Sequence, residues 1–274
     1  MKRYKTYRLI GPIVIGLLLL VTLFLHFYKK HALENASFYT GWVLLAVMGM
    51  LASYNLRKKL PVAPLGTSRG WLHFHVWMGM ATGIIFLFHI GFRWPNGPFE
   101  LLLASLYLGV FLSGFFGWII SRLYARRLTT HGREVIYEQI PMLLHGVRTK
   151  AEAIAVELVP KTESTALADF YSQRLHGYFS RPQNFWMHQV ESRRPGRLLL
   201  DDLNEQKRYM SSDEKVVVEE MADLVRLKDD LDYQYALQSV LKRWLFVHIP
   251  LTYSLLIFTV AHVIIVHAFN GSVS

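Results

Sequence analysis

Four histidines occur as two pairs with the same separation along the chain. His75 and His89 are 14 residues apart, and so are His248 and His262. In an α-helix a separation of this size is close to four turns, or about 21 Å along the axis, so both members of a pair lie near one helix face. Neutral imidazole is a common ligand of metal ions, including haem iron. The spacing therefore predicts two metal-ligating positions on each of two helices.

The composition places these helices in a membrane. Of the 274 residues, 52% are hydrophobic and only 18% are charged, which is too apolar for an ordinary soluble protein. A helix needs about 20 apolar residues to cross the hydrocarbon core, and an open strand cannot cross it. We therefore expect an all-α membrane protein, a five-helix transmembrane bundle with spans at Ile10–Phe27, Phe38–Leu56, Trp71–Phe92, Phe99–Tyr124 and Trp244–Phe269.

The order of the spans brings the two histidine pairs to matching depths. The third and fifth spans of a chain cross the membrane in the same direction, so His75 should lie level with His248, and His89 with His262. Two imidazoles that approach from opposite helices are the arrangement that axial ligation of a haem iron requires. We expect two stacked sites, an inner haem iron between His75 and His248 and an outer one between His89 and His262.

Histidine inside a membrane span also has roles other than binding a metal. A single histidine in a span is more often a hydrogen-bonded packing residue or a proton relay, and this is our interpretation of His26, His73 and His267 taken one at a time. Two pairs of equal spacing favour a shared purpose, because polar groups in a bilayer are costly and usually functional. Zinc would prefer four close ligands, whereas the members of each pair are about 21 Å apart.

Basic residues between the spans predict the orientation. Lys and Arg cluster before the first span, between the second and third, and after the fourth, whereas the opposite side has few. Positive residues are retained on the cytoplasmic side. We therefore expect the cytoplasmic (inner) membrane of a prokaryote, with the N-terminus in the cytoplasm and the C-terminus outside.

About 120 residues separate the fourth and fifth spans. We divide the chain into membrane spans at 1–124, a mostly helical cytoplasmic insert at 125–242 and a final span at 243–274. Apolar residues at three- and four-residue spacing predict helices, and clustered Pro and Gly predict a loop at Ser180–Gly196. The predicted helices are Ala151–Leu158, Ala166–Phe179 and Asp213–Val240, the last starting near Ser212. The insert has no GxGxxG or Walker pattern, so a nucleotide or flavin domain is not expected.

Charge and cysteine content exclude further classes. Residues 122–243 contain 19 basic and 18 acidic side chains, so most of the net charge of +10 lies in the membrane portion and reports topology. No basic stripe remains for nucleic acid. The chain has no cysteine, which rules out disulfides, Cys-ligated zinc or iron–sulfur clusters, and covalent CxxCH haem.

Three stretches resemble the membrane cytochrome b domains grouped with ferric-reductase-like and NADPH-oxidase-like proteins. They begin at His75 (HVWMGMATGIIFLFHIGFRWP), Ser113 (SGFFGWIISRLYARRL) and Trp244 (WLFVHIPLTYSLLIFTVAHVIIVHAF), and the resemblance covers the membrane part only, about half the chain. In that family two helices each donate two histidines to two b-type haems. The resemblance implies two haem b groups, the inner bound by His75 and His248 and the outer by His89 and His262.

The resemblance also implies a function in electron transfer. Family members that use cytoplasmic NADPH usually continue into a C-terminal flavin and nucleotide domain, whereas this sequence ends about five residues after its last span. We therefore expect a subunit of an oxidoreductase complex that carries electrons between a quinone pool, or a cytoplasmic donor, and an outside partner such as a multihaem cytochrome c. A quinone is a further candidate cofactor, and membrane lipid surrounds the spans.

Two other functions stay open. One is a ferric-reductase-type enzyme whose flavin domain is a separate polypeptide. The other is a transporter that uses intramembrane histidines as metal or proton sites. The transporter predicts no haem spectrum and favours carboxylates beside the histidines, and the interiors of the predicted spans contain none.

Charged residues that flank the spans are candidates for binding haem propionates. Arg93 and Trp94 follow the third span at its outer end. Arg69, and also Arg243, lie where they would serve the inner haem. Interfacial anchoring is the competing role for each of these side chains.

Three further positions each have two interpretations. Gly79 and Gly83 lie one turn apart between the ligands of the third span, where they would admit a porphyrin or pack against another helix in a GxxxG pattern. His267 follows the fifth span's outer ligand and is a candidate for a quinone contact or a proton exit.

Overall fold

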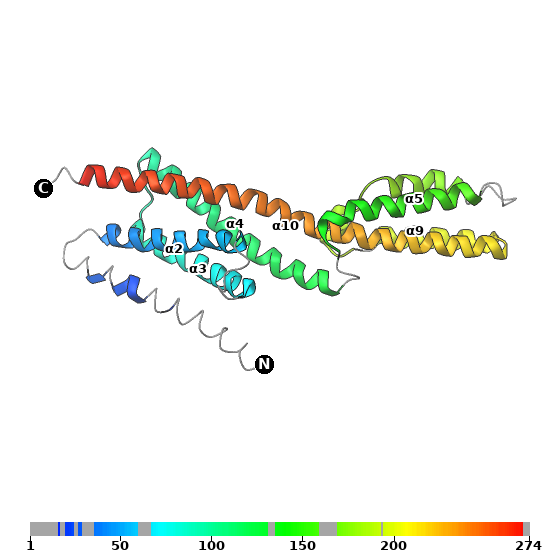
Figure 1. Cartoon of the computed structure of the whole chain (residues 1–274), viewed down its shortest axis with the longest axis horizontal. Coiled ribbons are helices and arrows are strands. Elements are labelled where there is room, and N and C mark those ends of the chain that lie inside the picture. The colour runs from blue at the N-terminus through cyan, green and yellow to red at the C-terminus, as the bar shows by residue number, and fades with distance from the viewer. Residues whose placement is uncertain are drawn as a thin grey trace, which may run out of the picture. The chain divides into compact units, whose positions relative to one another are not determined.

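The structure, a computed structural model, describes residues 16, 20–24, 27–28, 36–59, 67–130, 135–158, 169–192 and 194–270. Within these ranges every regular element is helical, and no strand occurs. The α-helices are α2 Ala36–Lys59, α3 Ser68–His89, α4 Pro98–Thr130, α5 Ile140–Leu158, α7 His176–Ser180, α8 Phe185–Gln189, α9 Arg194–Gln206 and α10 Ser212–Asn270 (Figure 1). Two 3-10 turns, η1 Tyr137–Gln139 and η3 Lys207–Tyr209, and the π-helical η2 Tyr171–Leu175 complete the order.

Four of these helices are long and apolar enough to cross a membrane. They contain the candidate spans Ala36–Tyr54, Gly70–His89, Pro98–Thr129 and Glu214–Phe269. This confirms an all-α chain with several membrane-spanning helices and indicates an integral membrane protein. The predicted first span, Ile10–Phe27, lies mostly outside the described residues, and those that are described in it are helical.

Helix α10 is much longer than a membrane is thick. Its 59 residues would extend about 90 Å, roughly three times the hydrocarbon core. Acidic and basic side chains are frequent up to Arg243, and none occurs from Trp244 to Phe269. The segment Trp244–Phe269 is therefore the membrane-spanning part of α10, and the charged part before it lies in water.

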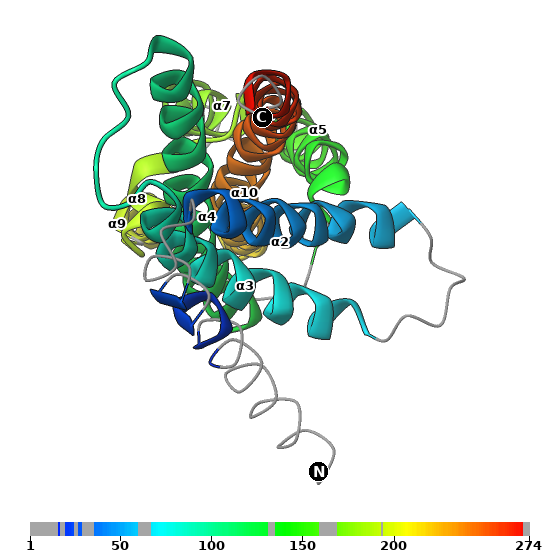
Figure 2. The same cartoon turned by 90° about the vertical axis from the view of Figure 1, so that its left-hand side faces the viewer.

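Contacts along the chain divide it into two compact units. One, here called the membrane unit, comprises Met1–Ile119 and Trp244–Ser274; the other, the insert unit, comprises Ile120–Arg243. Within the membrane unit, α2 and α3 run side by side in both views (Figures 1 and 2). Its core is formed by α2, α3, α4 and α10 around Leu44, Val47, Met48, Met78, Ile85, Phe86, Ala104, Tyr107 and Leu255.

The outward faces of the membrane unit are strongly apolar. Phe246 is 81% exposed and Ile257 is 69% exposed, and Leu112 and Phe116 on α4 are also exposed. Large apolar side chains on an outer surface are unfavourable in water but are the normal lipid-facing surface of a spanning helix. The burial pattern therefore agrees with the composition.

The insert unit has a hydrophobic core of its own. Helices α5, α7 and α9 pack on the charged part of α10 through buried Ile140, Val147, Ala151, Leu175, Tyr178, Phe179, Leu203, Met210, Val218, Met221, Ala222, Leu224, Val225 and Leu231. Ser211 and Glu214 form a capping box at the start of α10, in which each side chain contacts the other's backbone N–H. The predicted helix start near Ser212 is confirmed.

Two predictions about the insert need correction. The predicted loop Ser180–Gly196 is wrong in part, because it contains the short helix α8 and the first residues of α9. The prediction took Pro195 as a sign of a loop. Proline is well tolerated in the first turn of a helix, because its missing N–H costs no hydrogen bond there, and Pro195 lies in the first turn of α9. The separate helix Asp213–Val240 and final span are instead one continuous helix, α10.

Candidate functional site

The structure brings the predicted outer pair together. The ring centroids of His89, the last residue of α3, and His262 on α10 are 6.4 Å apart, and the ring planes are nearly perpendicular at 89°. Both rings belong to the membrane unit and come from helices that the sequence predicts to run in parallel. His89 and His262 are therefore neighbours, as the equal spacing of the two histidine pairs leads us to expect.

This separation fits two imidazoles on opposite sides of one metal ion. An imidazole nitrogen binds a metal at about 2 Å, and its ring centre lies about 1 Å behind it, so two axial ligands have ring centres about 6 Å apart. Among the described residues no group of three or more His, Cys, Asp or Glu is arranged to hold a metal. A haem iron needs only two ligands from the protein, so the residues present fit a haem better than zinc.

A backbone carbonyl fixes the orientation of His89. Nδ1 of His89 lies 2.9 Å from the carbonyl oxygen of Ser37 on α2, so Nδ1–H donates the hydrogen bond. The ring is then the tautomer whose Nε2 carries a free lone pair. Ligating histidines almost always donate their second nitrogen in this way, which orients the ring and raises its basicity. His262 stacks on Phe99 at 6.3 Å.

The His89 ring lies directly against Gly41 of α2. A Cβ at position 41 would lie 2.9 Å from Cε1 and 3.1 Å from Nδ1 of His89, closer than van der Waals contact allows. Glycine at position 41 therefore lets α2 approach the ring closely enough for the Ser37 carbonyl to accept the hydrogen bond from His89.

Gly41→Ala is accordingly expected to displace His89 and, if His89 and His262 hold a haem, to lower the haem content of the chain. Haem per chain, measured by pyridine haemochrome, checks this. Gly49→Ala is the matched control on the same helix, because nothing lies within 4 Å of a Cβ there. Equal haem content in both variants would contradict this role for Gly41.

A cavity of about 450 Å³ surrounds the outer pair within the membrane unit. This volume is in the range of pockets that hold cofactors. Its walls come from α2, α3, α4 and α10 and are mostly apolar. The polar side chains that line it are His89, His262, His267, Arg93, Glu100, Ser37, Thr259 and Tyr107.

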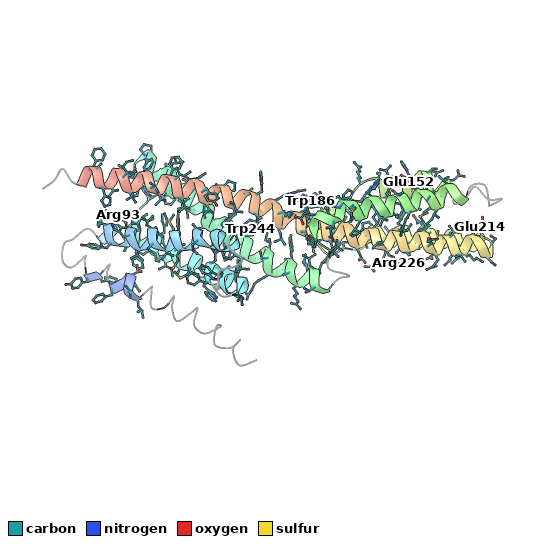
Figure 3. All side chains as sticks on the ribbon, viewed as in Figure 1. Arg93, Glu152, Trp186, Glu214, Arg226 and Trp244 are labelled. Carbon is teal, nitrogen blue, oxygen red and sulfur yellow. The ribbon has the colours of Figure 1, made fainter. Side chains whose placement is uncertain are left out.

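Arg93 and Trp94, which the sequence offers as candidates for binding a haem propionate, line this cavity in the connection between α3 and α4. Figure 3 labels Arg93. A guanidinium at the mouth of an apolar pocket is suited to pair with a carboxylate of the ligand. His267 also lines the cavity, and its ring packs 5.6 Å from Phe38 and from Trp42. Its Nδ1 lies 2.8 Å from the carbonyl oxygen of Val263, within the same helix.

The inner pair is described by different contacts. Nδ1 of His75 lies 3.2 Å from the carbonyl oxygen of Leu51, and its ring is 5.3 Å from Tyr54. Nδ1 of His248 lies 3.2 Å from Oγ of Ser113. Nδ1 of each histidine is thus engaged, as at His89. The inner site is supported by the orientation of its two rings.

Ser113 is a positioning residue for His248. If His248 holds a haem iron and Ser113 Oγ accepts from its Nδ1–H, removing the hydroxyl would make the imidazole a weaker donor to that iron. Ser113→Ala would then raise the midpoint potential of that haem by up to about 40 mV, the equivalent of one weak hydrogen bond of about 1 kcal/mol. Potentiometric titration checks this, with Ser105→Ala on the same helix as control. An unchanged potential would argue against the contact.

The other residues that the sequence suggests as candidates have different surroundings. A Cβ at Gly83 would lie 2.8 Å from the ring of Phe111, so this glycine serves helix packing, whereas Gly79 faces open space. His73 is exposed. Arg69 lies in the first turn of α3, and its side chain lies outside the described residues. The guanidinium of Arg243 lies 5.4 Å from the ring centre of Phe185, in the insert unit.

Sequence reasoning missed the contribution of the second span. Ser37 and Gly41 are small residues four apart, a pattern that marks close helix contacts in membranes and is the signal that was available. It also missed Glu100, which lies in the first turn of α4, at the end of the fourth span rather than in its interior, and lines the same cavity as the histidines.

No family model matches the chain, and neither the curated proteins nor the solved structures contain a match to it.

Proposed function

We propose that this chain is a dihaem cytochrome b that carries electrons across a membrane. In this proposal the donor is a quinone pool or a cytoplasmic reductant, the acceptor is a redox partner outside, and the chain is one subunit of a larger complex. We also propose that the chain has five spans and that its N-terminus and insert lie in the cytoplasm of a prokaryote.

The observation that carries the proposal is the outer pair. His89 and His262 come from different helices, their ring centres are 6.4 Å apart, and Nδ1 of His89 is held by the Ser37 carbonyl. A packing histidine in a membrane has no need of a second imidazole opposite it and an apolar cavity of about 450 Å³ around both.

The residues of this chain would bind and shield the cofactor. When bound, haem supplies a one-electron couple between ferric and ferrous iron. His89 and His262 would hold the haem iron from two different helices, and with both imidazoles bound the iron would transfer electrons without binding oxygen. The apolar wall of the cavity excludes water, and Arg93 balances the charge of a propionate at the mouth.

Electron transfer across a sealed vesicle tests the function. The full chain is reconstituted in vesicles that enclose oxidised cytochrome c, and dithionite is added outside. The proposal predicts reduction of the enclosed cytochrome c that is absent from protein-free vesicles and at least tenfold slower with His89→Ala. A wild-type chain that leaves the enclosed cytochrome c oxidised would refute transmembrane transfer.

Glu100 favours one alternative, a proton or metal transporter. Its carboxylate lines the same cavity as His262 and His267, and a carboxylate beside histidines is typical of ion pathways. The transporter predicts a folded chain without haem that moves protons or a divalent cation, and Glu100→Gln would abolish that movement. A haem-loaded chain with no such flux would exclude it.

A further inference from the structure

The insert unit contains a cavity of about 340 Å³, and none of the residues that line it is a histidine. Arg181, which precedes α8, and Arg243, near the middle of α10, both line it, together with Phe185 and Asp232. Neither guanidinium has a carboxylate partner in the described part of the chain. Two arginines in one hollow without acidic partners form a site for an anion.

Asp232 does not cancel this positive charge. Its Oδ2 accepts hydrogen bonds from Nζ of Lys228 and from the backbone N–H of Gln183. Lys228 therefore neutralises the carboxylate. Oδ1 of Asp232 is buried and has no hydrogen-bond partner among the described residues, so it is available to a donor such as a headgroup hydroxyl or amine.

The position of the cavity in the chain puts it next to the membrane. Arg243 is the last residue before the membrane-spanning segment Trp244–Phe269. Helix α8 is joined to the polar end of α4, where Tyr124 donates to Oε1 of Gln189 at 2.6 Å and Arg127 donates to the Gln189 carbonyl at 2.7 Å. The insert unit continues into a span through α4 at one end and through α10 at the other. Helix α8 thus lies next to both of these helices.

Helix α8 exposes a large apolar face at this level. Trp186, labelled in Figure 3, is 79% exposed and Met187 is 49% exposed, and Val190, the residue that follows the helix, is 71% exposed. Exposing an indole ring and two aliphatic side chains to water is unfavourable. Tryptophan beside basic residues is the composition of a segment that lies at the headgroup level of a bilayer.

We propose that the cavity between Arg181 and Arg243 binds the phosphate of an anionic membrane lipid, while the apolar face of α8 lies in the membrane interface beside it. The two guanidinium groups bind the phosphate oxygens. The ligand chemistry is a phosphodiester, and the apolar face of α8 assigns its source to lipid rather than to a free anion. The proposal requires only that the chain spans a membrane, and it is independent of haem.

Lipid retention tests the site. The full chain, purified in detergent, is exchanged into mixed micelles containing phosphatidylglycerol, and the bound lipid is counted by native mass spectrometry. Arg181→Gln/Arg243→Gln is expected to retain at least fivefold less phosphatidylglycerol than the wild-type chain. The control, Arg174→Gln/Arg226→Gln, removes the same charge from exposed arginines of the insert unit that pair with acids, and should retain as much as wild type.

Two results would overturn the proposal. Equal retention by both double variants would show that the cavity does not select lipid. Displacement of phosphatidylglycerol by millimolar inorganic phosphate would show a site for free anions.

A second measurement leaves both arginines intact. Because the chain contains no cysteine, Trp186→Cys introduces a single thiol for a fluorescent label, and Glu152→Cys, at a part-exposed position of α5, is the control. In vesicles with brominated phosphatidylglycerol the label at 186 should be quenched at least twofold more than the label at 152. Equal quenching would place α8 in water and overturn the proposal.

Discussion

Replacing His89 or His262 by alanine is expected to lower the haem content of the chain from two to about one. In our proposal each variant removes one of the two histidines that hold the outer haem, and the mostly apolar cavity would offer the iron no substitute. The inner haem, bound by His75 and His248 in our proposal, should persist. A pyridine haemochrome assay on the purified variants gives the count.

His267→Ala is the matched control for this prediction. His267 lines the same cavity, but its Nδ1 is bonded within its own helix and its ring packs on Phe38 and Trp42. This variant should keep two haems. A loss equal to that in His89→Ala would show that any disturbance of the cavity expels haem, and the outer pair would lose its special role.

Lys228→Met is expected to lower the free energy of unfolding of the insert unit by about 3–5 kcal/mol, the usual cost of leaving a buried charge without its partner. Lys228 and Asp232 are each about 1% exposed and form an ion pair one turn apart on α10. Nζ of Lys228 also lies 4.2 Å from the ring centre of Tyr178. Urea unfolding followed by circular dichroism measures the change while the spans stay in detergent.

The loss should grow as the pH rises. Burial raises the pKa of Asp232 from 3.8 to about 6 even though Lys228 opposes the shift. Without the lysine the pKa rises further, so the folded state binds a proton that the unfolded chain has released. Stability of Lys228→Met therefore falls as the pH rises from about 4 to beyond 6, because the unfolded state binds fewer protons there.

A second substitution separates the charge from the packing. Lys228→Met/Asp232→Leu removes both ions and should recover most of the lost stability, with little dependence on pH. A double variant as unstable as Lys228→Met, at every pH, would show that the lysine stem and not its charge is what the core requires.

The sequence predicts those features that depend on periodicity. Apolar length places the spans, and the equal spacing of the histidine pairs is enough to bring His89 beside His262, because helix geometry fixes both the face and the depth. The start of α10 follows from polar residues that cap it. These are local properties of the chain.

The missed features depend on contacts between distant segments. The acceptor for His89 is a backbone carbonyl, that of Ser37, and any residue type carries one. The role of Gly41 depends on how closely α2 approaches the ring, and α8 exists because Gln189 is bonded to α4 and to the Ala236 carbonyl of α10. No propensity or period encodes such partners.

The central claim, that two haems are bound by histidine pairs, is tested most directly by a reduced-minus-oxidised visible spectrum and a haem count on the purified wild-type chain. The account predicts the spectrum of low-spin b-type haem, with two haems per chain. A well-folded chain that binds no haem, in a preparation supplied with haem during expression, would contradict it and favour the transporter.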